Sequence, residues 1–208
     1  MFLQYPVQVI PFRVIGIDPG SNTLGVAVLD IDLASGTETL VDARTFDASK
    51  GLREYHNMLR VYGELATRVQ SHEDTLVGYF SFYRPHAVIC ESPFLGRFPA
   101  AFKALLACMF SIQRAVIRYD RFMPLHMADP MSVKAAVGVT SKGIPKGPRQ
   151  KGRKRARTNA ELAKDKVRDA VLGLTMVNAS GLDLTLLDEH SIDAIAVARA
   201  RVMAMLQP

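Results

Sequence analysis

Residues 13–31 read RVIGIDPGSNTLGVAVLDI, two apolar runs joined by a short polar turn. The first run, Arg13–Asp18, is rich in β-branched residues and leads into Asp-Pro-Gly-Ser, a pattern typical of a strand followed by a turn. The second run, Thr23–Ile31, has the same apolar character. These residues therefore predict two consecutive strands, with Asp18 at the end of the first.

The residues that follow extend this pair into an α/β arrangement. Ser35–Gly36 predicts a turn and Glu38–Phe46 a third strand, so the chain opens with a three-stranded meander. His86–Cys90 is an apolar fourth strand that ends at Glu91, and Phe122–His126 is a short fifth strand. Strands in a meander, followed by strands alternating with helices, predict an α/β fold with mixed strand directions. Apolar periodicity and capping residues place the helices at Leu52–Gln70, Thr75–Tyr83, Phe98–Tyr119, Pro130–Val137, Asn159–Leu172 and Asp188–Met205.

The composition is that of a folded domain. The chain has 208 residues, of which 49% are hydrophobic and 22% charged, and this argues against wholesale disorder. No stretch approaches about 18 uninterrupted apolar residues, and the N-terminus lacks the basic segment of a signal peptide. We therefore expect one domain over residues 1–208 with no membrane partner. Cys90 and Cys108 lie in apolar runs, which predicts buried thiols in a reducing cytoplasm and excludes a disulfide scaffold or a four-thiolate zinc site.

Positive charge is concentrated in one segment. Residues 142–157, KGIPKGPRQKGRKRAR, hold eight cations and no acid, so they account for more than the whole formal net charge of +6. Glycines, prolines and the absence of apolar periodicity predict a flexible loop over residues 141–158. Such a run favours contact with a polyanion, which releases its counterions on binding. A solvated charge run or a localisation signal is the alternative. The predicted phosphate contacts are Lys142, Lys146, Arg149, Lys151, Arg153, Lys154, Arg155 and Arg157.

Two acids occupy strand ends. Asp18 and Glu91 each follow a run that is expected to be buried, where a carboxylate is costly without a partner. If the two strands are parallel neighbours, both side chains emerge at one sheet edge, the edge where α/β sheets bind ligands. Carboxylates held that close raise each other's pKa unless a cation lies between them. Taken alone, Asp18 before Pro-Gly also suits a turn.

The final predicted helix carries a second polar pair. His190 and Asp193 are spaced i, i+3 and therefore share a face, while Asp188 or Glu189 would cap the helix. Carboxylate oxygens suit Mg²⁺ or Mn²⁺, and a neutral imidazole can join them. The opposite stripe is apolar and is expected to pack on the sheet: Ile192, Ile195, Ala196 and Met203.

Three blocks resemble the RuvC family of Holliday junction resolvases, within the RNase H-like nuclease superfamily. They are GIDPGSNTLGVAV (residues 16–28), VICESPFL (88–95) and DEHSIDAIAVA (188–198). Between them, PMSVKAAV (130–137) and KDKV (164–167) resemble further family steps in the same order. The resemblance implies an RNase H-like α/β fold, with a central five-stranded mixed sheet flanked by helices on both faces. It also implies a homodimer built on the helix at Phe98–Tyr119.

By position, the resemblance assigns Asp18, Glu91, His190 and Asp193 as catalytic and metal-binding residues. The implied activity is hydrolysis of a DNA phosphodiester with two Mg²⁺ ions per active site, for which Mn²⁺ would substitute. A two-fold dimer would resolve a four-way junction by paired nicks and leave 5′-phosphates. His190 would complete a metal shell or position the water.

The resemblance also points to DNA contacts outside the acidic set. Phe94 matches an aromatic that meets a base near the junction centre, with core or loop packing as the alternative. Lys134 and Lys164 match basic positions near the cleaved strand. The basic loop departs from the family, which has a short Gly-rich connection there, so specificity for four-way junctions stays open.

Three other functions compete with this interpretation. A broader branched-DNA or flap endonuclease is favoured by the long basic loop. A non-catalytic junction binder would need one of the four site positions to be lost, and all are filled. An actin-like or sugar-kinase phosphotransferase needs a second domain and a second Gly-rich loop. The expected partners are branched DNA and a second copy of the chain, at the nucleoid in the cytoplasm. The sequence leaves open whether a branch-migration motor takes part, and whether the source is cellular or viral.

Overall fold

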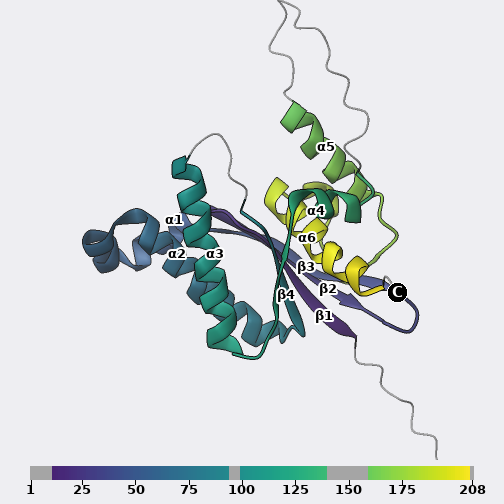
Figure 1. Cartoon of the computed structure of the whole chain (residues 1–208), viewed down its shortest axis with the longest axis horizontal. Coiled ribbons are helices and arrows are strands. Elements are labelled where there is room, and N and C mark those ends of the chain that lie inside the picture. The colour runs from purple at the N-terminus through teal and green to yellow at the C-terminus, as the bar shows by residue number, and fades with distance from the viewer. Residues whose placement is uncertain (1–10, 94–98, 140–158, 207–208) are drawn as a thin grey trace, which may run out of the picture.

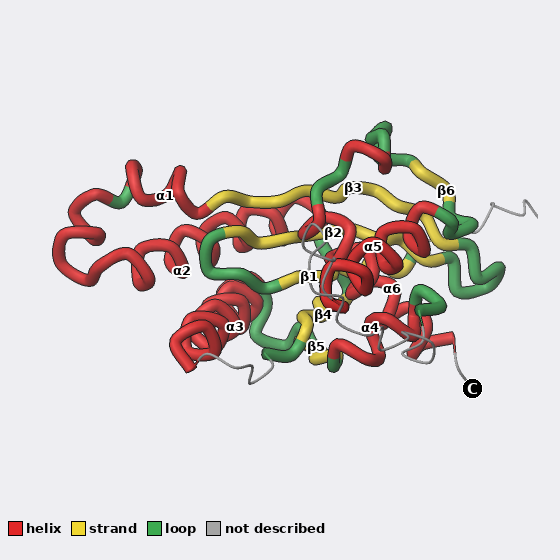
Figure 2. The backbone as a smooth tube through the Cα atoms, turned by 90° about the horizontal axis from the view of Figure 1, so that it is seen from above, coloured by secondary structure: helices red, strands yellow, loops and turns green. Residues whose placement is uncertain are grey.

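The computed structural model describes residues 11–93, 99–139 and 159–206, with the backbone alone for residues 159–163. The strands are β1 (Phe12–Asp18), β2 (Thr23–Ile31), β3 (Glu38–Asp47), β4 (Ala87–Glu91), β5 (Leu125–Ala128) and β6 (Val177–Asn178). They form one sheet in the order β5-β4-β1-β2-β3-β6; Figure 1 labels the first four strands along the chain and Figure 2 all six. β2 pairs antiparallel with β1 and β3, while the β1–β4, β4–β5 and β3–β6 pairs are parallel. This confirms the mixed α/β sheet and the opening meander.

Helices cover both faces of the sheet (Figures 1 and 2). They are α1 (Ala48–Glu54), α2 (His56–Tyr83), α3 (Pro99–Tyr119), α4 (Pro130–Ala136), α5 (Asn159–Leu172) and α6 (Glu189–Leu206). One hydrophobic layer joins β1, β2 and β4 to α2 and α3, through residues such as Ile15, Phe80 and Ile112. The other joins the opposite face to α4, α5 and α6, through residues such as Leu29 and Ile195. Strands with two covered faces read as the continuous apolar runs seen in the sequence.

Two glycines let α6 lie directly on the sheet. A Cβ on Gly16 would stand 2.3 Å from the backbone nitrogen of Ala198, and one on Gly25 would stand 2.1 Å from the carbonyl oxygen of His190. Any larger residue at either strand position would push the helix away. This contact brings the start of α6 to the end of β1, because Gly25 pairs with Asp18 in the β1–β2 ladder.

The packing of α6 corrects the predicted apolar stripe. The helix faces the sheet on the side of His190, Ala194 and Ala198, the same side as the site. Ile192 and Ile195 are buried as expected, but Met203 is only half-buried. The reason is that α4 and α5 also cover α6, so residues 194–198 are all buried and no single stripe marks the core face.

Several element boundaries differ from the prediction. The sheet has six strands, because the two exposed residues of β6 join the outer edge of β3, which a pair of residues cannot signal. The predicted break between residues 70 and 75 is absent, since α2 continues through that segment with His72 and Glu73 buried; the helix is instead kinked at Gly63. β5 begins at Leu125, after a turn that Asp120 closes by accepting from the backbone N–H of Phe122.

Helix α3 is more apolar than the absence of a long uninterrupted apolar stretch suggested. Within the described residues it alone is long and apolar enough, by length and composition, to cross a membrane, with a mean hydropathy of 1.5 over 18 residues. The length and composition of α3 therefore do not exclude a membrane span, contrary to the expectation from the sequence. The core helix of a soluble protein can have the same length and hydropathy. In this fold one face of α3 packs on α2 and the sheet through Cys108, Ile112 and Val116, while Phe110 and Ile117 are exposed.

Candidate active site

Asp18 and Glu91 lie at the same edge of the sheet. β1 and β4 are parallel neighbours, and Ile17 pairs with Cys90, so the two acids follow side by side at the strand ends. This confirms the arrangement expected from the sequence. Both side chains are half-buried, with Asp18 17% exposed.

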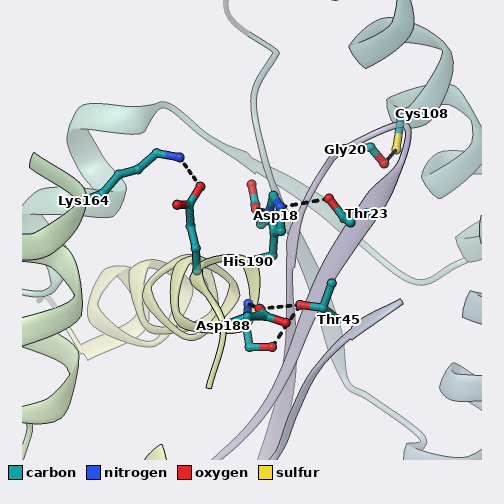
Figure 3. Close-up of polar contacts among 10 residues, drawn as sticks. Asp18, Gly20, Thr23, Thr45, Cys108, Lys164, Asp188 and His190 are labelled. Carbon is teal, nitrogen blue, oxygen red and sulfur yellow. Dashed lines mark hydrogen bonds and ion pairs between the residues drawn. The ribbon is translucent and has the colours of Figure 1, made fainter. Parts of the chain in front are cut away.

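The start of α6 is tied to the sheet by a polar cluster. Asp188 caps the helix by accepting a hydrogen bond from the backbone N–H of Ser191, at 2.8 Å. The hydroxyl of Thr45 on β3 donates to the same carboxylate oxygen at 2.6 Å and lies 3.0 Å from the hydroxyl of Ser191 (Figure 3). The capping role considered for Asp188 is therefore confirmed.

His190 bridges two strands from the first turn of α6. Its Nδ1 lies 2.8 Å from Oδ2 of Asp18, and its Nε2 lies 2.8 Å from Oγ1 of Thr23 (Figure 3). The hydrogen bond to Asp18 raises the pKa of His190, because the carboxylate favours the imidazolium.

Burial and neighbouring negative charge perturb two carboxylates of the site. Burial raises the pKa of Glu91 to about 7, with further contributions from the negative charges of Asp18 and Asp193. Burial likewise raises the pKa of Asp193 to about 6, with Asp18 adding to the effect. These directions are those of like charges gathered where water screens them poorly. The site therefore carries negative charge that the described protein does not fully neutralise.

Two lysines border the acids. Lys134 and Lys164 line a cavity of about 210 Å³ together with Glu91 and Asp193. The ammonium of Lys164 forms an ion pair with Glu189 (Figure 3). A second cavity of about 190 Å³ is lined by both residues. Both lysines thus lie beside the acids, and Lys164 is paired with Glu189; their contact with DNA stays a prediction.

The donor set fits a hard divalent cation in kind, with three carboxylates and an imidazole at one edge. In the described part of the chain, however, no group of three or more His, Cys, Asp or Glu side chains is arranged so that it could hold a metal ion. As the side chains lie, His190 is directed to Asp18 and Thr23. The structure thus gathers the predicted ligands without closing a coordination shell.

Other predicted contacts lie outside the described residues. These are Phe94 and the whole run of eight cations between residues 142 and 157. Conversely, the sequence did not single out Thr23, Thr45 or Gly25. Each looks like an ordinary strand residue, and the only signal for Thr23 is a polar side chain at the first position of an apolar strand.

Three solved structures are similar to this fold. T. thermophilus RuvC in complex with a Holliday junction substrate is 19% identical over 93% of this chain and 96% of that chain, with a TM-score of 0.61. Fowlpox virus resolvase in complex with substrate Holliday junction DNA is 10% identical over 94% and 99% of the two chains, with a TM-score of 0.52. The yeast mitochondrial Holliday junction resolvase Ydc2 is 13% identical over 96% and 84%, with a TM-score of 0.53.

The sequence itself matches no family model and no curated protein. The likeness is therefore one of fold, and it extends over nearly the whole chain. It confirms the predicted RuvC-like, RNase H-like architecture.

Proposed function

We propose that this protein is a metal-dependent endonuclease that resolves four-way DNA junctions by paired nicks. The observation that carries the proposal is the set of three half-buried carboxylates, Asp18, Glu91 and Asp193, at one edge of a sheet with the RuvC-like fold. Carboxylates whose pKa is raised by burial and by nearby negative charge, as for Glu91 and Asp193, favour a bound cation. Two of the similar structures are complexes of resolvases with Holliday junction DNA.

In this proposal, some residues of the chain bind the metal and others contact the phosphates of the DNA. Mg²⁺, when bound, would supply an activated water and stabilise the leaving 3′ oxygen, with products that carry 5′-phosphates. Asp18, Glu91 and Asp193 would hold it, and His190 would complete the set. Lys134 and Lys164 border the cavity beside the acids and would contact the phosphates of the cut strand.

The exposed apolar face of α3 supports a homodimer. Phe110 and Ile117 are more than half exposed, whereas the other face of the helix is in the core. Burial of this exposed apolar face would be favourable, and a second copy of α3 is the partner we favour. A two-fold axis there would present two sites to strands of like polarity.

The broader branched-DNA nuclease remains a second candidate because of the cations between residues 142 and 157. A panel of four-way, three-way, flap and duplex substrates separates the two. Cleavage confined to the four-way substrate supports a resolvase, and equal cleavage of flaps and three-way forms supports the broader enzyme.

The test of the chemistry is Asp18→Asn. We expect it to keep junction binding and to lower Mg²⁺-dependent cleavage by more than about 100-fold, since even groups that only support a metal ligand are worth about 10–100-fold. The matched control is Asp169→Asn, which changes an exposed aspartate on α5. Unchanged nicking by the purified Asp18→Asn protein would contradict the proposal.

A further inference from the structure

The imidazole of His190 is held at both nitrogens. Nδ1 faces the carboxylate of Asp18 on β1, and Nε2 faces the hydroxyl of Thr23 on β2, each at 2.8 Å. The side chain is 35% exposed, so close packing alone does not fix the ring. Its orientation is set by these two polar contacts.

The hydroxyl of Thr23 and the ring of His190 are each held in place by regular secondary structure. Thr23 is the first residue of β2 and is paired with Asp47 of β3. The backbone of His190 rests on Gly25, and the helix start is capped by Asp188. The position of the Thr23 hydroxyl relative to the ring is therefore set by the sheet and the helix together.

A hydroxyl suits this position because it both donates and accepts. With the Nδ1–H donating to the Asp18 carboxylate, Nε2 of a neutral ring accepts from the Thr23 hydroxyl. With the lone pair of Nδ1 free for a cation, Nε2–H donates to the same oxygen. A histidine that ligates a metal through one nitrogen usually donates its other N–H to such a partner.

We propose that Thr23 is a positioning residue, which orients His190 so that Nδ1 faces Asp18 and any divalent cation bound there. Nε2 is directed to the sheet and takes no part in ligation. This inference rests on the proposed metal-dependent function, and it assigns to Thr23 a role that the acidic set alone does not indicate. Removal of the hydroxyl leaves the contact with Asp18 as the one side-chain hydrogen bond of the ring among the described residues, and the ring can then turn and present either nitrogen to that carboxylate.

The experiment compares the wild type with Thr23→Val, which keeps the β-branched shape, and with Thr23→Ser, which keeps the hydroxyl. The probe is Mn²⁺, titrated calorimetrically and then examined by pulsed EPR on protein labelled with ¹⁵N at Nδ1 of histidine. We expect Mn²⁺ in the wild type to couple to the labelled nitrogen. Thr23→Val should bind Mn²⁺ about 10-fold more weakly and lose or split that coupling, whereas Thr23→Ser should retain both. Thermal unfolding of the metal-free proteins controls for folding.

The outcomes separate this inference from the proposed function. Mn²⁺ bound to the wild type without coupling to the labelled Nδ1 would overturn the role of Thr23 and leave the nuclease proposal standing. If Thr23→Val bound Mn²⁺ with the affinity of the wild type and kept the coupling to Nδ1, that would also overturn the role of Thr23 and leave the nuclease proposal standing. A wild-type protein that binds no Mn²⁺ would instead contradict the proposed function itself.

Discussion

The acids of the interior and those of the sheet edge differ in what neutralises them. Glu73 is 1% exposed, and Arg114 and Arg118 of α3 lie on its carboxylate at 3.1 and 2.8 Å. Three further buried acids have the same kind of partner: Asp30 with Arg13, Asp42 with Arg44, and Glu38 with Arg199. At the edge, neither Glu91 nor Asp193 forms an ion pair with any residue that the structure describes.

This contrast separates structural acids, which are paired within the protein, from the acids that we propose bind a cation. A carboxylate taken out of water is costly, and the interior acids offset that cost with a guanidinium. The edge acids leave it partly uncompensated, as the raised pKa values of Glu91 and Asp193 show. Among the described residues, the fold pairs its buried acids but leaves these two half-buried acids without an ion pair, as the proposed cation site requires.

Loss of an interior pairing should have the largest effect on stability. In the double variant Arg114→Ala/Arg118→Ala, the carboxylate of Glu73 would be buried without a partner, at a cost of about 3 kcal/mol in the free energy of unfolding. Chemical denaturation measures it. Arg121→Ala, an exposed arginine after α3, is the control. Equal stability of the double variant and the control would show that pairing does not distinguish the two groups of acids.

Removal of an edge charge should act in the opposite direction. At about 1.4 kcal/mol per unit, the pKa shift of Glu91 sets an upper limit of roughly 3 kcal/mol on the gain from Glu91→Gln in the metal-free protein at pH 8. We expect about 2 kcal/mol, because the side chain is only half-buried and solvent screens part of the repulsion. Folding raises the pKa of Glu91 to about 7. The charged Glu91 therefore destabilises the folded state increasingly as the pH rises from the ordinary pKa of a glutamate toward 7. The gain from Glu91→Gln should therefore shrink toward pH 5.

Thermal unfolding across pH 5–8 checks this behaviour. Glu54→Gln, an exposed acid on α1, should show no such gain. A Glu91→Gln protein less stable than the wild type at pH 8 would place Glu91 among the structural acids.

Added cation should have the smallest effect. Mg²⁺ at ten times its dissociation constant should stabilise the wild type by about 1.4 kcal/mol, because it binds only the folded state. Asp193→Asn should lose most of this gain, since it removes a carboxylate from the site. Calorimetric unfolding with and without Mg²⁺ measures the difference, and an undiminished gain in Asp193→Asn would exclude that residue as a ligand.

The acids of the site were predictable because each lies at a recognisable local position. Asp18 and Glu91 end apolar strands, and His190 and Asp193 share a face in the first turns of a helix. Such patterns need only the residues on either side, and the same holds for the bounds of β2. Strand β6 and the continuity of α2 through residues 70–75 were missed, because β6 depends on pairing with β3 and that part of α2 is buried in the fold.

By itself, the sequence determined the α/β class, the opening meander and the identity of the acids, since apolar periodicity and strand-end position act over neighbouring residues. Only the tertiary structure decided that α6 lies against Gly16 and Gly25, that Thr23 meets Nε2 of His190, and that Lys164 pairs with Glu189. These contacts join residues that are mostly far apart in the chain. Their distances, and the pKa shifts that follow from burial, exist only once the helices and the sheet have packed together.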